Sequence, residues 1–260
     1  MATPTVNFMS YNSTGFNSIK TAWIRDLCKL ASIDYCSIQE HFMSTKTVDK
    51  YIKNQLPDYF PYFVPAFIPP TQDCGRAKWG LAQLSLKISN TRIKTSRFRV
   101  QAQILEFPTT RLLWINTYFP NDPMTLILDD KELIEVLGEI ENILDSNDFD
   151  DCILQGDLNW DMSRNTGFSS RMKQFMEKIG LLSVWEHHPV SYTHMHTDLI
   201  STSTLDHFLV NERLLSVIVE AGVLHLGDNL SRHSPIMMKL DLGKLPLQKR
   251  SRTAALRRPA

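Results

Sequence analysis

The sequence lacks any long apolar run. No stretch approaches the roughly 20 apolar residues that a membrane-spanning helix needs, although 43% of the 260 residues are hydrophobic. The opening residues, MATPTVNF, have neither the basic segment nor the apolar segment of a secretory signal peptide. We therefore expect no membrane span and no secretion. The apolar residues suffice for the core of a large globular domain.

Closely spaced cysteines are also missing. None of the four forms a Cys-x-x-Cys pair; they are Cys28, Cys36, Cys74 and Cys152. This distribution argues against a zinc ribbon and against a disulfide framework. We interpret the cysteines as reduced core thiols of a cytosolic or nuclear protein. The pairs His187-His188 and His194-x-His196 have no cysteine or glutamate nearby to complete a four-ligand zinc set.

A net charge is absent, which taken alone speaks against nucleic-acid binding. The charges are nevertheless unevenly distributed, because residues 244–260 hold six lysines and arginines and no acid. That tail has no periodicity and is typical of a linker. Residues 87–99 hold five basic residues and no acid. This segment is either an edge that faces phosphates or a solvated pair of strands with alternating charges.

Strand-like and helix-like periods alternate along the chain. Strands are predicted over residues 5–11, 33–38, 81–88, 98–106, 111–117, 152–155, 205–210 and 234–241. Helices are predicted from position 16 to 30, from about 124 to 144, from about 169 to 179, and near 211–217. This order favours sheets covered by helices over an all-β barrel.

Polar residues follow several of the apolar strands, where a side chain can emerge into a cleft. Glu40 follows one strand, and Tyr118 lies at the end of another. In GDLN, Gly156 permits a tight turn, and Asp157 and Asn159 can face the same side of an extended loop. A carboxylate and an amide there would suit a hard cation or a phosphate, although both residues are also common turn formers.

Taken in order, these pieces resemble the endonuclease/exonuclease/phosphatase family, over roughly residues 5 to 242. The matching pieces are SYN around Asn12, QE at Glu40, TYFPN at 117–121, GDLNW at 156–160, SYTH at 191–194, STLDHFLV at 203–210 and SRHSPI at 231–236. Within the family, GRAKWG at 75–80 and the LDHFLV strand look most similar to the endonuclease domain of LINE-type retrotransposons. The resemblance implies an α+β fold, a four-layer sandwich of two packed mixed sheets flanked by helices.

The resemblance also implies metal-assisted hydrolysis of a phosphodiester bond. Glu40, helped by Asn12, would hold one Mg²⁺ or Mn²⁺ ion, which polarises the phosphoryl oxygen and stabilises the leaving 3′ oxygen. Asp157 would orient or deprotonate the attacking water. Asn159 and Tyr118 would donate hydrogen bonds to the phosphate.

The resemblance implies that His233 contacts the phosphate or transfers a proton, since the ordinary pKa of histidine lies near neutral pH. Asp206 would accept a hydrogen bond from this ring and fix its tautomer. Further substrate contacts are expected from Asn121, Thr193, Arg232 and Arg76.

Arg232 departs from the family pattern, which has aspartate between the serine and the histidine of SRHSPI. Two outcomes are open. Arg232 could bind substrate phosphate or pair with Asp228, leaving activity intact. Alternatively, its charge could repel the metal and weaken the enzyme.

The function implied by the resemblance is a Mg²⁺-dependent endonuclease that nicks one strand of target DNA and leaves a 3′-hydroxyl for reverse transcription. Residues 1–243 would form this domain, and residues 244–260 would lead to a reverse-transcriptase region. The partners would be double-stranded DNA and that region, with no membrane and no small-molecule cofactor. The protein would be made in the cytoplasm and act in the nucleus. Two alternatives remain: a phosphatase of the same fold acting on inositol phosphates or lipids, and a non-catalytic DNA-binding module.

Overall fold

The computed structural model describes residues 5–44, 55–67, 77–86, 90–96, 98–124 and 130–246. Its strands are β1 (Thr5–Asn12), β2 (Tyr35–Gln39), β3 (Phe60–Val64), β4 (Leu81–Ser85), β5 (Asn90–Ile93), β6 (Val100–Glu106), β7 (Arg111–Tyr118), β8 (Asp151–Asp157), β9 (Leu182–Ser183), β10 (His194–Met195), β11 (Thr202–Ser203), β12 (Asp206–Val210), β13 (Ile218–Val223) and β14 (Ile236–Asp241). Its helices are α1 (Ser18–Leu30), α3 (Lys131–Ser146), α4 (Gly167–Ile179) and α5 (Glu212–Leu215), with 3-10 turns at Val184–Glu186 and Leu242–Lys244. Within these ranges no helix is both long and apolar enough to cross a membrane.

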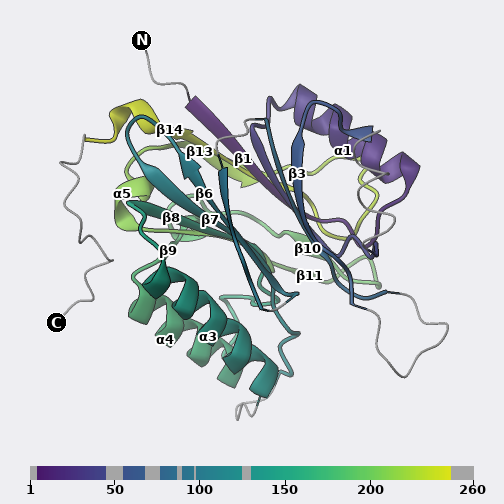
Figure 1. Ribbon diagram of the computed structural model, residues 1–260. Coiled ribbons are helices and arrows are strands. Elements are labelled where there is room, and N and C mark those ends of the chain that lie inside the picture. Colours follow the sequence, from purple (N-terminus) through teal and green to yellow (C-terminus); the bar gives the residue numbers. More distant parts are fainter. Residues whose placement is uncertain are drawn as a thin grey trace.

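Two six-stranded mixed sheets pack face to face (Figure 1). The first has the strand order β13-β14-β1-β2-β4-β3, and the second has the order β5-β6-β7-β8-β12-β9. Each contains a parallel pair, β1 with β2 and β7 with β8. Helix α1 covers the outer face of the first sheet, and α3 and α4 cover that of the second. The expected four-layer sandwich is confirmed.

Three apolar clusters separate these layers. The cluster between the two sheets includes Phe8, Trp114, Phe208 and Met238, all without exposed surface. A second cluster joins α1 to the first sheet through Ile24 and Leu27. The third and largest joins α3 and α4 to the second sheet. Each large apolar side chain buried in this way contributes about 1.5–3 kcal/mol, so the helices are held mainly by their apolar faces.

Several elements differ from the sequence-based prediction. Strands β3, β5 and β13 were not predicted, because they lie at or beside sheet edges and have half-exposed residues that weaken the two-residue period. The helix expected near 211–217 is only one turn, α5. Helix α3 begins at Lys131, where the carboxylate of Asp130 accepts from the backbone N–H of Leu133 and caps the helix.

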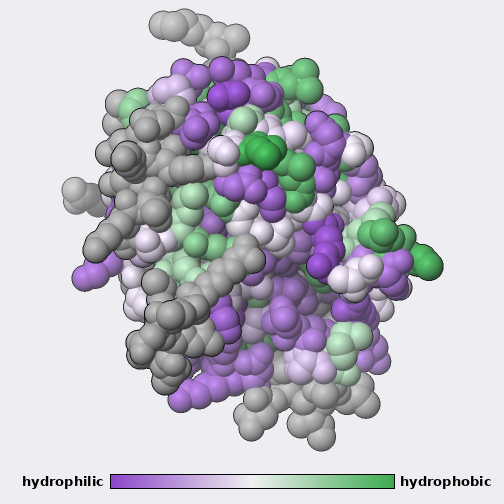
Figure 2. All heavy atoms as spheres, turned by 90° about the vertical axis from the view of Figure 1, so that its right-hand side faces the viewer, coloured by the Kyte–Doolittle hydropathy of each residue, from purple (hydrophilic) through white to green (hydrophobic). Residues whose placement is uncertain are grey.

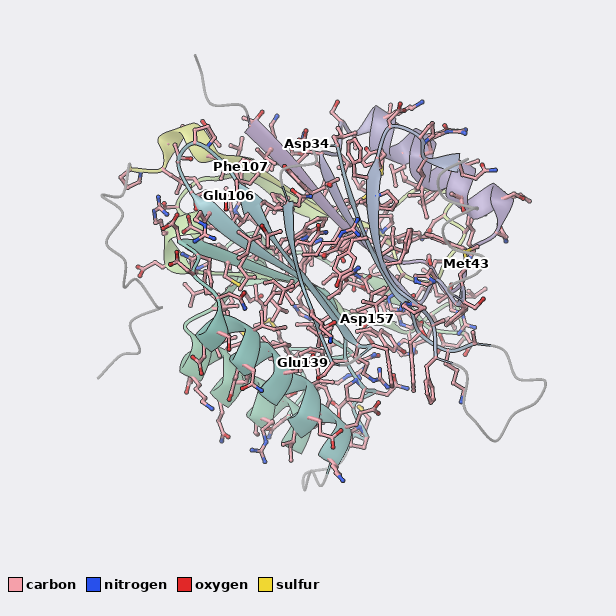
Figure 3. All side chains as sticks on the ribbon, in the orientation of Figure 1. Asp34, Met43, Glu106, Phe107, Glu139 and Asp157 are labelled. Carbon is pink, nitrogen blue, oxygen red and sulfur yellow. The ribbon has the colours of Figure 1, made fainter. Side chains whose placement is uncertain are left out.

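The residues that face between the sheets change from apolar to polar along each strand. Alternate positions are Phe8, Ser10 and Asn12 in β1, Trp114, Asn116 and Tyr118 in β7, and Ile153, Gln155 and Asp157 in β8. Because side chains alternate with a period of two, the last of each series emerges at the same end of the sandwich. Figure 3 places Asp157 at the end away from Glu106 and Phe107. The polar ends of the strands therefore meet there.

Candidate active site

A cavity of about 310 Å³ opens at this end of the sandwich. We call it the site cavity; its lining is almost entirely polar and consists of Glu40, Tyr118, Asn121, Asp122, Asp157, Asn159, Arg164, His194, His196, Leu205 and His233. The face toward β10 and β11 is largely hydrophilic, with scattered apolar patches (Figure 2). A larger cavity, of about 580 Å³, lies between Tyr62 and Phe98 and is lined by no carboxylate or histidine among the described residues. The carboxylates and histidines of the site cavity therefore favour it, rather than the larger cavity, as the active site.

Gly156 places Asp157 at the floor of the site cavity. The sequence suggests a turn at this glycine, but the structure has it inside β8. Its φ is +146°, and a Cβ atom would lie 1.9 Å from the carbonyl oxygen of Thr117. Glycine is therefore needed for the close approach of two backbones and for a φ that side chains disfavour.

The side chain of Asn12 joins the two carboxylates of the site. Its Nδ2 donates to Oε2 of Glu40 at 2.9 Å and to Oδ2 of Asp157 at 2.8 Å. Its Oδ1 accepts from the backbone N–H of Thr14 at 3.0 Å. Because that N–H can only donate, it fixes which end of the amide faces the carboxylates. Asn12 thus positions Glu40 and Asp157 through hydrogen bonds.

Glu40 lies on a strained segment just after β2, with φ at +55°. The next residue, His41, is 1% exposed, and its Nδ1 accepts from the backbone N–H of Met43 at 3.0 Å. Burial lowers the pKa of His41 to about 4. A Cβ atom on Gly80 would lie 2.5 Å from this ring. His41 and Gly80, whose joint role no sequence signal indicated, fix the backbone that carries Glu40.

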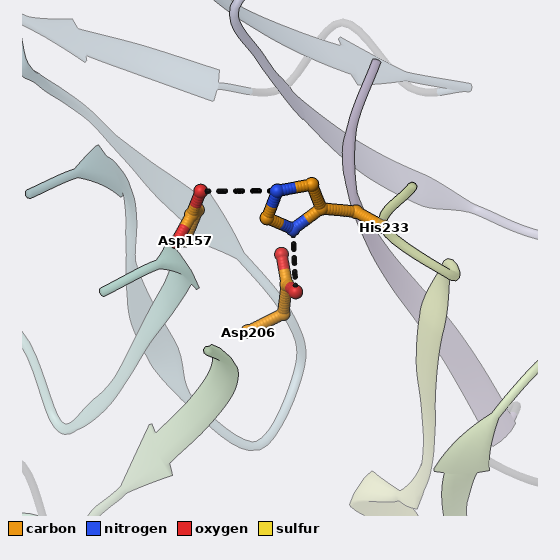
Figure 4. Close-up of side chains that lie close together, drawn as sticks. All are labelled: Asp157, Asp206 and His233. Atoms are coloured by element: carbon orange, nitrogen blue, oxygen red, sulfur yellow. Dashed lines mark hydrogen bonds and ion pairs between the residues drawn. The ribbon is translucent and has the colours of Figure 1, made fainter. Parts of the chain in front are cut away.

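His233 lies between two aspartates (Figure 4). Its Nδ1 is 2.9 Å from Oδ2 of Asp206, and its Nε2 is 3.7 Å from Oδ2 of Asp157. Burial by itself would lower the pKa of His233, but the charges of Asp206 and Asp157 outweigh burial and raise it to about 9. The ring is therefore protonated at neutral pH, with Nδ1 donating to Asp206 and Nε2 on the Asp157 side.

Two acids in the cavity hold their protons more tightly than usual. Burial, together with the charge of Asp206, raises the pKa of Asp157 well above its ordinary range. Burial and the charges of Asp157 and Glu40 raise the pKa of Tyr118, so its hydroxyl remains protonated. The guanidinium of Arg99 lies 5.1 Å from the Tyr118 ring centroid and supports that ring. For Asp157, the raised pKa suits a general base near neutral pH.

The structure does not support the predicted contact between Thr193 and substrate. Thr193 is fully buried, and its hydroxyl accepts from the backbone N–H groups of Leu205 and Asp206 at 2.9 and 3.0 Å. It therefore cannot touch a substrate, and it instead holds the backbone of Asp206. Nδ2 of Asn159 donates to the carbonyl of Phe119 at 2.9 Å, which leaves its second N–H available.

The other residues predicted to contact substrate do not lie deep in the site cavity of the described structure. Asn121 is exposed at the rim of the site cavity. Arg232 is exposed and is not among the described lining residues, and within the described chain it forms no salt bridge with Asp228. Arg76 lies outside the described residues. In the basic segment 87–99, Arg99 is buried against Glu132 at 2.7 Å, so it does not face solvent phosphates.

Three lining residues were not expected in this site. Arg164 and Asp122 had no motif to mark them, and His196 had drawn attention only as half of a zinc pair. His194, in the SYTH motif, lies 4.5 Å from the His233 ring between centroids. Burial and the charge of His233 lower the pKa of His194 to about 4.

The described residues include one cluster whose ligand atoms could converge on a metal ion, formed by Asp157, Asp206 and His233 within 4.8 Å of one another. His233 is a poor ligand for a hard cation, because Asp206 engages its Nδ1 and such cations prefer oxygen donors. Glu40 and Asp157 fit a divalent cation better. Both face the site cavity, and carboxylate oxygens are the donors that hard cations prefer.

No protein-family model matches the chain, and no curated protein matches it either. Solved structures do match. An AP endonuclease from Archaeoglobus fulgidus aligns with a TM-score of 0.71 and 15% identity, over 91% of this chain and 99% of its own. The AP endonuclease LMAP from Leishmania major gives 0.69 and 17%, over 91% and 87%. The 3′ phosphatase NExo from Neisseria, bound to a product DNA hairpin, gives 0.68 and 16%, over 90% and 99%. At these identities the similarity shows a shared fold.

Proposed function

We propose that this protein is a metal-dependent phosphodiesterase that nicks DNA. The observation that carries the proposal is the position of Asp157, which touches the Glu40–Asn12 pair on one side and faces the His233–Asp206 pair on the other. Carboxylates with a protonated imidazole can activate water and stabilise a phosphate in one cavity. Solved structures of this fold include DNA-processing enzymes, which supports the choice of substrate.

The reaction forms a bond from a water oxygen to phosphorus and breaks the bond from phosphorus to the 3′ oxygen. Asp157 takes the proton from the attacking water, since burial raises its pKa. Nε2–H of His233 and the hydroxyl of Tyr118 donate hydrogen bonds to the phosphate oxygens. The departing 3′ oxygen takes a proton from solvent, which leaves a 3′-hydroxyl and a 5′-phosphate.

Glu40 would hold a divalent cation, with Asn12 fixing the position of its carboxylate, while Asp157 takes the proton of the water. We propose Mg²⁺, with Mn²⁺ as a substitute, because both prefer oxygen donors. When bound, such an ion polarises the phosphoryl oxygen and stabilises developing negative charge.

We further propose that the protein acts in retrotransposition. This role is supported by the GRAKWG and LDHFLV segments, which resemble LINE-type endonuclease domains. The nick would supply the 3′-hydroxyl that primes reverse transcription in the nucleus. Residues 1–243 would form the nicking domain, and residues 244–260 would link it to a reverse-transcriptase region of the same polyprotein.

A supercoiled-plasmid nicking assay with Mg²⁺ tests the proposed activity. The wild type should convert supercoiled DNA to open circles, and Glu40→Ala and His233→Ala should each reduce the rate at least a hundredfold. Glu220→Ala and His187→Ala, at exposed positions, serve as matched controls. Chelation by EDTA should abolish nicking. If Glu40→Ala or His233→Ala nicked at the control rate, this assignment of the site would be wrong.

A 3′-phosphatase activity is the second candidate, because the NExo structure has the same fold and binds a DNA hairpin. A hairpin oligonucleotide with a 3′-phosphate, incubated in parallel with the plasmid, separates the two. Release of inorganic phosphate without plasmid nicking would favour the phosphatase.

A further inference from the structure

Arg164 is the only arginine or lysine among the described residues that line the site cavity. The lining also contains the carboxylates of Glu40, Asp122 and Asp157. A cavity with this charge repels the polyanionic backbone of DNA, except where a cation faces it. The guanidinium of Arg164 supplies such a cation, and its side chain is 27% exposed.

Hydrogen bonds hold Arg164 in place. Its Nη2 donates to the hydroxyl of Ser203, on β11, at 2.8 Å, and the same hydroxyl lies 2.7 Å from Nε2 of His196. Ser203 is 3% exposed, so this anchor is fixed by the surrounding fold. The acid that lies nearest to this guanidinium among the described residues is Asp161. Its Oδ2 is 3.9 Å from Nε and already accepts from the backbone N–H of Thr204 at 3.4 Å. The guanidinium, with five N–H donors, therefore has donors left for another anion.

His194 gives a second and independent sign of a ligand. Its Nδ1 is buried and has no hydrogen-bond partner in the described part of the chain. Its backbone is fixed from two sides, by the strand pair with Ser203 and by a bridge to His233. A buried ring nitrogen without a partner costs free energy unless a ligand or water supplies one.

We propose that Arg164, His194 and His196 form an anion subsite that binds the phosphate next to the scissile one. The three residues line the same cavity as Glu40 and Asp157, and His194 touches the ring of His233. DNA carries one phosphate per nucleotide in each strand, so a scissile phosphate beside His233 brings a neighbouring one to this wall. The subsite rests on the proposed function, since it assigns a second contact of the same substrate. It fixes the register of the strand across the cavity.

The test is a chemical double-mutant cycle with synthetic DNA duplexes. All three duplexes contain the position at which the protein nicks, mapped beforehand. The first has all its phosphates intact. The second and third each carry one neutral methylphosphonate, on the 5′ side and on the 3′ side of the scissile phosphate respectively. Wild type, Arg164→Gln and Arg164→Lys are compared, with Arg171→Gln, an exposed arginine on α4, as the matched control.

On the intact duplex, Arg164→Gln should lose about tenfold in kcat/KM, mainly through KM, because a charge-assisted hydrogen bond is lost. Wild type should show a similar loss on one of the two neutral duplexes. On that duplex, Arg164→Gln should lose nothing more, because the two changes remove the same contact. Arg164→Lys should recover part of the loss, and Arg171→Gln should behave as wild type.

Equal losses from Arg164→Gln on all three duplexes would overturn the subsite and indicate a structural role or a contact with the scissile phosphate. If wild type nicks no duplex, the proposed function has failed, and the subsite is tested separately by fluorescence anisotropy of the same duplexes in Ca²⁺. There the same coupling in binding must appear between Arg164 and one phosphate. Its absence would reject the subsite whatever the enzyme's activity.

Discussion

Asp151 and Asp157 are the first and last residues of β8, and both side chains are buried. Asp151 accepts from the hydroxyl of Thr110 at 2.6 Å and from Nδ2 of Asn211 at 2.9 Å, and it forms an ion pair with Arg213. Asp157 accepts from Asn12 and from a backbone N–H, and the cation nearest to it in the described structure is the imidazolium of His233, at 3.7 Å. Arg213 therefore neutralises Asp151 with a permanent charge, whereas no arginine or lysine of the described residues pairs with Asp157. A buried charge without full compensation raises the free energy of the fold, and it is acceptable where the group must exchange protons or bind a metal.

Gly156→Ala should have the largest effect, because it breaks the end of β8 that carries Asp157. The added Cβ would collide with the backbone of Thr117, which cannot rotate away. We expect a loss of at least about 4 kcal/mol in the free energy of unfolding, seen as insoluble protein or a much lower Tm. Gly138→Ala is the control, since the added Cβ would meet nothing in the described structure within 4 Å beyond its own helix backbone and chain neighbours, and alanine favours a helix interior. A normally folded Gly156→Ala variant would contradict the assigned contact.

Asp157→Asn should reduce nicking about a thousandfold, because the amide cannot take a proton from water. Its free energy of unfolding should change by no more than about 1 kcal/mol, since the buried charge is unfavourable to the fold. Nicking rates and urea unfolding curves measure the two effects. Substantial activity in this variant would assign the water-activating role to another group.

Asp151→Asn should show the reverse pattern. It leaves Arg213 half-buried without its carboxylate, so we expect a loss of about 3 kcal/mol in the free energy of unfolding. At a temperature where the variant remains folded, nicking per folded molecule should equal that of the wild type. A loss of activity larger than the loss of folded protein would mean that the two ends of β8 are coupled.

The pKa values of His233 and His41, both buried, should shift in opposite directions from the ordinary value of about 6.5. NMR should give a pKa near 9 for His233 and near 4 for His41. The stabilisation from protonated His233 is complete below about pH 6.5 and is lost as pH rises through 9. His41 acts oppositely, because the fold disfavours its charged form and loses stability as pH falls from about 6.5 to 4. In Asp157→Asn the pKa of His233 should fall, and an unchanged value would deny the electrostatic contact.

The smallest effect is expected at Arg232. Its side chain is exposed and does not line the site cavity within the described structure. Arg232→Asp and Arg232→Ala should both change Mg²⁺-dependent nicking by less than about threefold, the scale of a screened surface charge. A many-fold gain in Arg232→Asp alone would show that the arginine weakens metal binding.

The periods of the sequence were enough for the central strands and the long helices, since β1, β7, β8, α1 and α4 have strong apolar patterns. They were not enough for β13, whose half-exposed residues have no clear alternation. Motif order marked residues that prove to share one cavity, including Glu40, Asp157 and His233. Thr193 was predicted to contact substrate but is buried. The sequence could not show this, because a hydroxyl that caps backbone N–H groups and one that binds substrate look identical in sequence.

The sequence by itself determined which strands end in polar side chains, because a period of two and the change from apolar to amide to acid are local properties of each strand. Only the tertiary structure decided which of those side chains meet. It brought Arg164, His194 and His196 to the wall of the site cavity, and it buried Asp157 beside His233, with no arginine or lysine of the described residues paired to it. Burial and the distances between charges depend on the packing of distant segments, and these quantities set the pKa values on which the chemistry rests.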